Sequence, residues 1–375
     1  MSAVRILHCA DIHIGAAETG IGEKSQSRRL EALLTFEKII GLAKENRVDI
    51  ILIAGDLFCS NTVPAQMAAR VFECIGSVPE IKVVFAAGNH DPLNAESPFK
   101  KQSLPKNLYV LPENDSFFYF EDLNAKVCGR SFSEVYLKGE RRFAADVSDD
   151  TVNVMCQHGE VTSDAGSDYN AITGEFIDNS GMDYIALGHI HKRSKIQRRG
   201  STSFAYCGCP EGLGFDELGD KGVYIGEVDK GSADMRFYKT SIRNHENVSV
   251  DVSDCSDNPA AAQKITAFLS EKYGAGFEDN LYKIVLTGSV ADGCWFDPAE
   301  IAGRLMQTVY FAKVKDETGV FEDLDTLKGE NSLKGIFVQK MLALIAEKPE
   351  EADKIRAALN IGLKAFSSEV GYNED

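Results

Sequence analysis

Residues 81–91 read IKVVFAAGNHD, and the first seven of them form a mostly apolar, β-branched and aromatic run that predicts a buried strand. The run ends in Gly88, Asn89, His90 and Asp91. An amide oxygen, an imidazole and a carboxylate thus leave one strand together, and this set suits a hard or borderline divalent cation. The same four residues are also compatible with an ordinary polar turn, and the stretch by itself does not separate the two interpretations.

Two earlier apolar runs end in the same manner. The run from Val4 to Cys9 is followed by Asp11 and His13, and the run from Asp49 to Ala54 is followed by Asp56. Helices are predicted between these strands, over about 25–46 and 64–77. The first carries apolar residues near helical spacing, namely Leu30, Leu33, Leu34, Ile39 and Ile40. Alternating strands and helices predict parallel βαβ units, in which ligands bind outside the carboxyl ends of the strands.

Two later apolar runs also end in potential metal ligands, which are all histidines. The apolar run 151–157 ends in His158, and the run 183–187 is followed by His189 and His191, which are two residues apart. A single histidine is more often a structural side chain than a ligand. Five histidines at strand ends, which we expect at the same edge of one sheet, indicate a metal centre together with Asp11, Asp56 and Asn89. His8 and His245 lack such company and receive no role.

Composition limits the class of protein. A chain of 375 residues with 44% hydrophobic and 26% charged residues fits a soluble globular protein of two domains. No apolar run approaches the ~18 residues of a membrane span, and the start of the chain lacks the pattern of a secretory signal. Nine scattered cysteines indicate reduced thiols and a cytoplasmic protein, and we interpret the Cys207 and Cys209 pair as structural. The net charge of −17 argues against a surface that grips nucleic acid everywhere, but it allows a local basic track.

The pattern changes near residues 240–247, and this change suggests the domain limits. We expect one domain over 1–242, a smaller α+β domain over 243–325 and a helical segment over 326–375. In the last segment, two helices separated at Pro349 each carry an apolar stripe. These stripes either pack on each other and on the smaller domain, or they dock a partner protein.

The ordered series Asp-x-His, Gly-Asp, Gly-Asn-His-Asp, His-Gly and Gly-His-x-His resembles the calcineurin-like metallophosphoesterase superfamily over about residues 1–230. Within it, the chain is most similar to DNA repair exonuclease subunits of the SbcD and YhaO type. Supporting stretches are Asp56-Leu57-Phe58, Asp183 to Leu187, and Tyr206 to Gly212 leading to Glu217-Leu218-Gly219. The resemblance implies an α/β fold with a two-layer β-sandwich flanked by helices, and a site for two divalent metal ions, usually Mn²⁺.

The resemblance also implies a role for each site residue. One metal would be held by Asp11, His13 and His191, the other by Asn89, His158 and His189, with Asp56 bridging both. A bridging carboxylate holds two cations roughly 3.5–4 Å apart, where they clamp a phosphate and activate water without a separate general base. His90 would then be free to protonate the leaving oxygen, and Asp91 would orient the His90 region through a hydrogen bond.

Basic residues follow the last histidine pair directly. Those expected to contact a nucleic-acid backbone are Lys192, Arg193, Lys195, Arg198 and Arg199, and a second basic group comprises Lys138, Arg141 and Arg142. Either group could instead belong to a solvated, charged hairpin.

Three classes of function are compatible with these residues. The favoured one is a DNA double-strand exonuclease or endonuclease subunit that acts in DNA repair with an SMC-like ATPase, which the C-terminal helices would clasp. The resemblance also allows a homodimer. The alternative enzyme is a phosphodiesterase or phosphatase for a small nucleotide or a phosphoprotein. A catalytically silent scaffold is the third class, and the complete residue set, His90 included, argues against it.

Overall fold

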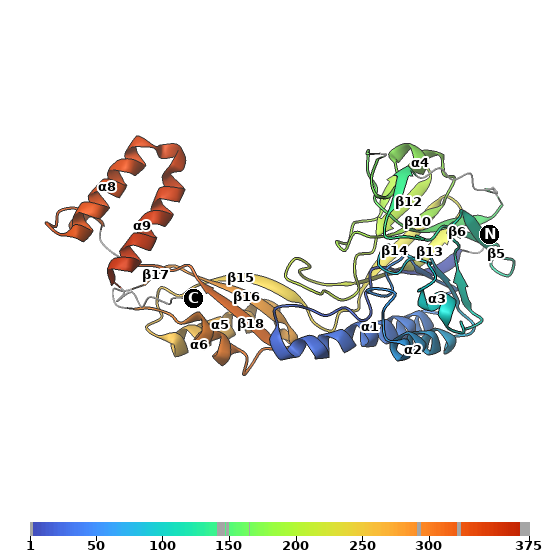
Figure 1. Cartoon of the computed structure of the whole chain (residues 1–375), viewed down its shortest axis with the longest axis horizontal. Coiled ribbons are helices and arrows are strands. Elements are labelled where there is room, and N and C mark those ends of the chain that lie inside the picture. The colour runs from blue at the N-terminus through green and yellow to red at the C-terminus, as the bar shows by residue number, and fades with distance from the viewer. Residues whose placement is uncertain are drawn as a thin grey trace. The chain divides into compact units, whose positions relative to one another are not determined.

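The computed structural model describes residues 3–140, 147, 150–164, 166–290, 294–320 and 324–367. The chain divides at Asn244/His245 into two compact units, which are described separately. Figure 1 shows the elements of both units along the chain.

The first unit contains two sheets of six strands each. The first sheet has the order β14-β13-β1-β2-β3-β4 and the second the order β11-β12-β10-β8-β6-β5. The strands of the first sheet are β1 (Val4–Cys9), β2 (Ile50–Ile53), β3 (Lys82–Phe85), β4 (Leu108–Val110), β13 (Gly222–Asp229) and β14 (Ser232–Lys239). Those of the second are β5 (Ser116–Phe120), β6 (Ala125–Gly129), β8 (Val152–His158), β10 (Tyr184–Gly188), β11 (Gln197–Arg199) and β12 (Thr202–Tyr206). A short pair of strands, β7 (Leu137–Glu140) and β9 (Tyr169–Ala171), accompanies them.

Parallel pairing dominates the centre of each sheet. In the first, β1, β2, β3 and β4 pair in parallel, so that Leu7 lies opposite Ile51 and Ile51 opposite Val83. In the second, β6, β8, β10 and β12 pair in parallel. Strand β13 joins the other side of β1 in antiparallel orientation, with Val4 opposite Val228. The carboxyl ends of four successive parallel strands therefore lie at one edge of each sheet.

The two sheets pack face to face, and helices cover their outer faces. Ile6, Leu52 and Val84 of the first sheet share a buried cluster with Val154 and Ala186 of the second. Alternate residues of the first sheet face the opposite way and pack against two helices, and the outer face of the second sheet packs against a third. These helices are α1 (Ser25–Glu45), α2 (Ala65–Gly76) and α4 (Gly174–Asn179). Two short helical turns complete the unit: η1 (Gly22–Lys24) directly precedes α1, and α3 (Pro98–Lys101) lies between β3 and β4. This confirms the expected β-sandwich flanked by helices.

The expectation that all polar strand ends lie on one sheet was wrong. Asp11, Asp56 and Asn89 follow strands of the first sheet, whereas His158 ends β8 and His189 follows β10 in the second sheet. Sheet membership depends on which strands pair over long distances, and the apolar runs alone do not encode it.

Helix α1 also differs in detail from its expected apolar stripe. Leu30 and Leu34 are each 52% exposed, while Arg28 is fully buried. Three carboxylates surround the Arg28 guanidinium and compensate its charge; they belong to Glu18, Glu31 and Glu211. The buried face of the helix thus includes an ion-pair network that a hydrophobicity pattern does not reveal.

The second unit is a mixed domain of helices and strands followed by a helical hairpin. Its main sheet has three parallel strands in the order β15-β16-β18, which helices connect. The elements are β15 (His245–Asp251), α5 (Asn258–Tyr273), η2 (Phe277–Asp279), β16 (Leu281–Thr287), α6 (Pro298–Leu305) and β18 (Phe311–Asp316), with the short pair β17 (Ser289–Val290) and β19 (Gly319–Val320). Asp257 and Asp297 cap the two main helices with their side chains, and a proline follows in the first turn of each.

The helical segment comprises α7 (Leu324–Leu327), α8 (Leu333–Glu347), η3 (Pro349–Glu351) and α9 (Ala352–Ser367). Val338 of α8 packs with Leu359 and Leu363 of α9 in a small buried cluster. Leu333 is 74% exposed and Ile361 is 70% exposed, so part of the apolar surface of this hairpin faces outward.

Candidate metal centre

Unusual backbone conformations mark the strand ends that carry the expected ligands. Asp11, His13 and Asp56 have φ angles of 52°, 49° and 51°, and His189 has a φ of 100°. Non-glycine residues rarely adopt positive φ, and such strained residues cluster at functional sites. The backbone is shaped here so that these side chains turn toward a common point.

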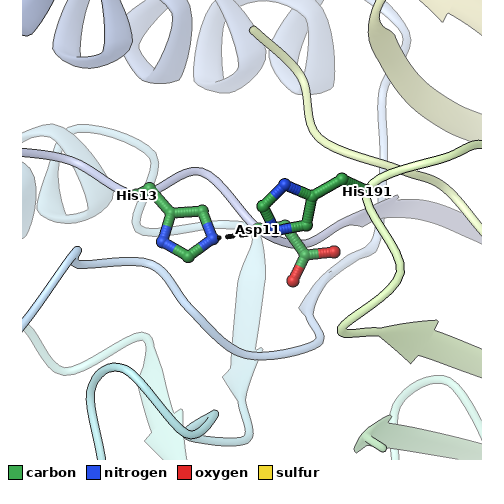
Figure 2. A group of neighbouring side chains, drawn as sticks. All are labelled: Asp11, His13 and His191. Carbon is green, nitrogen blue, oxygen red and sulfur yellow. Dashed lines mark hydrogen bonds between the residues drawn. The ribbon is translucent and has the colours of Figure 1, made fainter. Parts of the chain in front are cut away.

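Asp11, His13 and His191 form the first group of neighbouring side chains, as Figure 2 shows. Their ligand atoms all lie within 4.8 Å of one another, and the Nε2 atoms of the two histidines are 3.1 Å apart. Residues from the loop after β1 of one sheet and from the loop after β10 of the other therefore converge. The three side chains expected to hold one metal are brought together.

Asp56 lies between this group and a second one. Its Oδ2 is 3.7 Å from His13 Nε2 and 3.5 Å from His158 Nε2. Gly88 allows this approach, because a Cβ at that residue would lie only 2.2 Å from Asp56 Oδ1. The carboxylate thus faces histidines of both groups, which is the placement that a bridging ligand requires.

The remaining expected ligands surround His158. The Oδ1 of Asn89 is 3.0 Å from His158 Nε2, and the ring of His189 is centred 5.2 Å from the ring of His158. The backbone N–H of His189 donates to both oxygens of Asp11, at 2.9 and 3.1 Å. The second set therefore lies next to the first, and Asp11 also fixes the loop that carries His189.

His90 is exposed and lies beside the first group. Its ring is centred 4.8 Å from that of His13, and its Nδ1 is 3.3 Å from the carbonyl oxygen of Cys59. A ligand atom of His90 also lies within 4.8 Å of ligand atoms of His13 and Asp56. His90 is therefore placed to donate a proton at the edge of the centre. It is also close enough to His13 and Asp56 to share a metal ion with them.

Asp91 is fully buried and supports the backbone of two loops. Its Oδ1 accepts hydrogen bonds from the N–H groups of Gly88 (2.9 Å) and Asp56 (3.2 Å), and its Oδ2 accepts one from Phe58 (3.1 Å). Among the described contacts, its carboxylate bonds the backbone of its own loop and of the loop after β2. The arrangement suits a residue that positions Asp56.

Burial sets the electrostatics of the centre. Desolvation raises the pKa of Asp11 and of Asp56, and their mutual repulsion raises that of Asp11 further. Desolvation also lowers the pKa of His158 to about 3 and that of His189 to about 4. The described ion pairs of these two carboxylates involve histidines alone.

These residues fit a pair of divalent cations. Asp11 and Asp56 are buried beside histidines of which burial keeps His158 and His189 neutral, and bound cations would stabilise the two carboxylates. Carboxylate, imidazole and amide oxygen donors are the set expected for a borderline or hard divalent ion.

Glu217 belongs to this arrangement and was not among the predicted site residues. Its carboxylate bonds Nδ1 of His191, while its Oε2 accepts a 2.7 Å hydrogen bond from the N–H of Leu213. Although burial opposes charge on both partners, their interaction raises the pKa of His191 to about 9 and lowers that of Glu217 to about 2. A carboxylate that holds the far nitrogen of a ligating histidine fixes the tautomer and orientation of the ring. The stretch Glu217-Leu218-Gly219 supported the family resemblance, but the sequence did not assign the glutamate a contact with His191.

The basic run after His191 separates into two parts. Arg198 and Arg199 lie on β11, which forms an antiparallel hairpin with β12. Arg199 binds Asp178 through two nitrogens, at 3.0 and 2.7 Å, and Arg198 donates to the carbonyl oxygens of Gly200 and Gly231. Lys192 and Arg193 instead line a pocket next to His191, and Lys195 is exposed.

The second basic group is described only in part. Lys138 lies 3.4 Å from Asp168, and Arg141 and Arg142 fall outside the described residues.

The cysteines are free, and those at 207 and 209 are buried, in keeping with a structural role. Across the described ranges, no helix has both the length and the apolar character needed to cross a membrane.

Several known proteins are similar to this chain. A family model described as calcineurin-like phosphoesterase matches residues 4–193. The uncharacterized metallophosphoesterase YhaO of Bacillus subtilis (strain 168) is 25% identical over 408 residues, which cover 97% of this chain and 98% of that protein. The DNA double-strand break repair protein Mre11 of Aeropyrum pernix is 25% identical over 268 residues, which cover 67% of this chain and 64% of that relative. Among solved structures, the purple acid phosphatase PPD1 of yellow lupin seeds aligns with a TM-score of 0.41 and 13% identity over 64% of this chain and 52% of that chain.

Proposed function

Because the chain belongs to the calcineurin-like phosphoesterase family, we propose that it is a phosphodiesterase with two divalent metal ions that cleaves DNA. The family places it among metal-dependent phosphoester hydrolases. In the proposed form it is an exonuclease or endonuclease subunit for DNA double-strand ends, acts in DNA repair and uses Mn²⁺.

The observation that carries the proposal is the position of Asp56. One oxygen of its carboxylate lies 3.5 Å from His158 and 3.7 Å from His13, so a single atom faces both groups of expected ligands. In the proposed assignment Asp11, His13 and His191 hold one ion, and Asn89, His158 and His189 hold the other. Asp56 is then the ligand shared by both.

The chemistry follows from these positions. When bound by these residues, two divalent cations would supply positive charge to the phosphate oxygens and would lower the pKa of water to near neutrality. His90, exposed at the edge of the centre, is placed to donate a proton to the leaving oxygen of the ester. Asp91 bonds the backbone N–H of Asp56 and thereby holds the bridging residue in position.

DNA is favoured as substrate by the relatives and by local charge. The relative from Aeropyrum pernix is named for DNA double-strand break repair, and YhaO matches over nearly the whole chain, second unit included. The chain as a whole carries a net charge of −17, yet Lys192 and Arg193 follow the expected ligand His191 directly. A basic pair next to the metal centre of an acidic protein suits the approach of a phosphate backbone.

We further propose an assembly. Residues 1–242 would form the nuclease domain, residues 243–325 would form a second, α+β domain, and the segment 326–375 would dock an SMC-like ATPase. The exposed Leu333 and Ile361 on the α8–α9 hairpin support the docking role, since exposed apolar surface is typical of sites that bind another protein. Nine free cysteines fit action in the reducing cytoplasm.

The test compares four substrates. Purified protein with Mn²⁺ is offered end-labelled duplex DNA, single-stranded DNA, cyclic nucleotides and a chromogenic phosphodiester. We expect cleavage of duplex DNA, and loss of this cleavage on chelation. Activity confined to cyclic nucleotides and the chromogenic ester would instead support an enzyme for small phosphodiesters.

A further inference from the structure

A pocket of about 400 Å³ lies beside the metal centre, next to His191. It is formed by the loop after β10, the turn around Gly208 and the start of β13, and its charged side chains include Lys192, Arg193, Asp220 and Lys221. Gly208 fits here because a Cβ would lie 2.7 Å from the carbonyl oxygen of His191. The wall of the pocket is therefore packed directly against the backbone of an expected metal ligand.

Lys221 is the most informative residue of this pocket. It is only 9% exposed, and its one described side-chain hydrogen bond is a long contact of 3.5 Å to the carbonyl oxygen of His191. Within the described part of the chain, Lys221 takes part in no ion pair. The carboxylate of Glu217 attracts Lys221 only from beyond ion-pair distance. Burial of an ammonium group without a direct counter-ion is costly, so an anion in the pocket would stabilise Lys221.

Arg193 is held in a fixed position on the same pocket. Its guanidinium carbon lies 3.8 Å from the centroid of the Phe237 ring, and it also hydrogen-bonds the hydroxyl of Tyr224. Stacking on an aromatic ring orients the plane of the guanidinium, and its further N–H donors match the oxygens of a phosphate group.

The acidic residue of the pocket is already compensated. The Oδ1 of Asp220 lies 2.7 Å from Lys239 Nζ and accepts a hydrogen bond from Asn244 at 2.8 Å. Lys192, Arg193 and Lys221 therefore leave the pocket with an excess of positive charge.

We infer that this pocket binds a backbone phosphate of the nucleic-acid strand, next to the phosphate that is cleaved. The inference rests on the proposed function, since it assumes that the substrate is a strand. Arg193 is only two residues from His191, so a phosphate in the pocket would be a close neighbour of the one at the metals. A small phosphodiester has no second phosphate, and the pocket would thus favour strands over small esters.

The experiment measures how DNA affinity depends on salt. Full-length protein loaded with Mn²⁺ is titrated against a fluorescent duplex with phosphorothioate linkages, which keep the charge but resist hydrolysis. The variants are Lys221→Met, Lys221→Arg, Arg193→Gln and, as a matched control, Lys44→Met, which removes one exposed positive charge from α1. In Lys221→Met and Arg193→Gln the affinity should fall several-fold at low salt, and the slope of log affinity against log salt should decrease by about one. Lys221→Arg should restore the wild-type slope, and Lys44→Met should leave it unchanged.

Each other outcome has a distinct meaning. Wild-type slopes in both Lys221→Met and Arg193→Gln overturn the inference and leave the proposed nuclease function intact. A wild-type protein that hydrolyses the chromogenic ester but has no affinity for DNA overturns both. In a parallel arm, inorganic phosphate is added and thermal unfolding is followed. If phosphate protects wild type but not Lys221→Met while the DNA slopes stay equal, the pocket takes a free anion and the strand-binding inference is wrong.

Discussion

The backbone N–H of His90 donates a 2.9 Å hydrogen bond to Oδ1 of Asp56. The other oxygen of the same carboxylate faces His13 and His158. The loop after β3, which carries the expected proton donor, is thereby fixed to the expected bridging ligand after β2. Substitutions at these two residues should nevertheless have different effects.

Replacement of Asp56 by alanine should weaken binding of both metal ions, because both lose their shared anionic ligand. Elemental analysis after dialysis measures the bound metal per chain. Asp56→Asn is the matched variant, since it keeps an oxygen that accepts from His90 but loses the charge. Full metal content in Asp56→Ala would contradict the bridging assignment.

Replacement of His90 by alanine should leave the metal content unchanged and lower phosphodiester hydrolysis by ~10²-fold or more, as expected for loss of a general acid. Metal content and turnover of a chromogenic diester are measured on the same preparation. Parallel loss of metal and activity would show instead that His90 is a ligand, a role that its distance from His13 and Asp56 also permits.

Glu217→Gln should lower the affinity for Mn²⁺ by about 10–100-fold, since the substitution removes the charge that orients His191 but preserves the side-chain shape. Calorimetric titration of the metal-free protein gives this affinity without reference to activity. Glu227→Gln serves as control because Glu227 is exposed and pairs with Arg5 on the protein surface. Equal affinities for Mn²⁺ in the two variants would show that Glu217 does not support metal binding through His191.

His8 should make stability depend on pH. It is fully buried between the sheets, 2.9 Å from the hydroxyl of Tyr184 and 3.1 Å from the carbonyl oxygen of Leu187, and its burial lowers its pKa from 6.5 to about 3. Because the folded pKa is the lower one, the unfolded chain binds the extra proton below pH 6.5. The stability associated with His8 is therefore present above pH 6.5 and is lost as the pH falls toward 3.

Because the pKa of His8 differs between the unfolded and the folded chain, the unfolding free energy should fall by about 1.4 kcal/mol per pH unit between these two pKa values. Urea unfolding at a series of pH values from 7 down to 4 measures it. His8→Gln should show a shallower decline than wild type by about that slope, even if its stability at pH 7 is lower. Parallel curves for the two proteins would refute the assignment.

The docking role of the C-terminal hairpin can be tested without deleting it. Leu333→Lys combined with Ile361→Lys changes two exposed residues and should leave the hairpin folded, since Val338 and Leu359 form its buried contact. We expect loss of co-purification with a co-expressed ATPase partner and unchanged hydrolysis of a chromogenic diester. Truncation after Gly329 should have the same effect. A truncated chain that still binds the partner would place the docking surface elsewhere.

The strands and their polar ends could be predicted because each buried strand is a short apolar run, and its end is marked by glycine or a polar residue. The start of α5 is encoded locally in the same way, since Asp257 caps its first turn and Pro259 lies within that turn. The family pattern then gave each polar residue an expected place around two metal ions. All of these signals are local in the chain, so a single sequence is enough to detect them.

Three features could not be predicted because they depend on long-range contacts. The second sheet arises from pairing such as that of β6 with β8, which no apolar run specifies. Glu217 reaches His191 across 26 residues of loop and strand. Arg28 is buried only because carboxylates from three different segments surround it.

The antiparallel pairing of β1 with β13 has a consequence for synthesis of the protein on the ribosome. Strands β1, β2 and β3 are complete early, but the other side of β1 stays an open edge until residues 222–229 emerge. An unpaired, apolar strand edge is a template for aggregation. The nascent chain must therefore protect β1 over the time in which more than half of its residues are translated, and a slow ribosome or a premature stop before β13 should yield insoluble fragments.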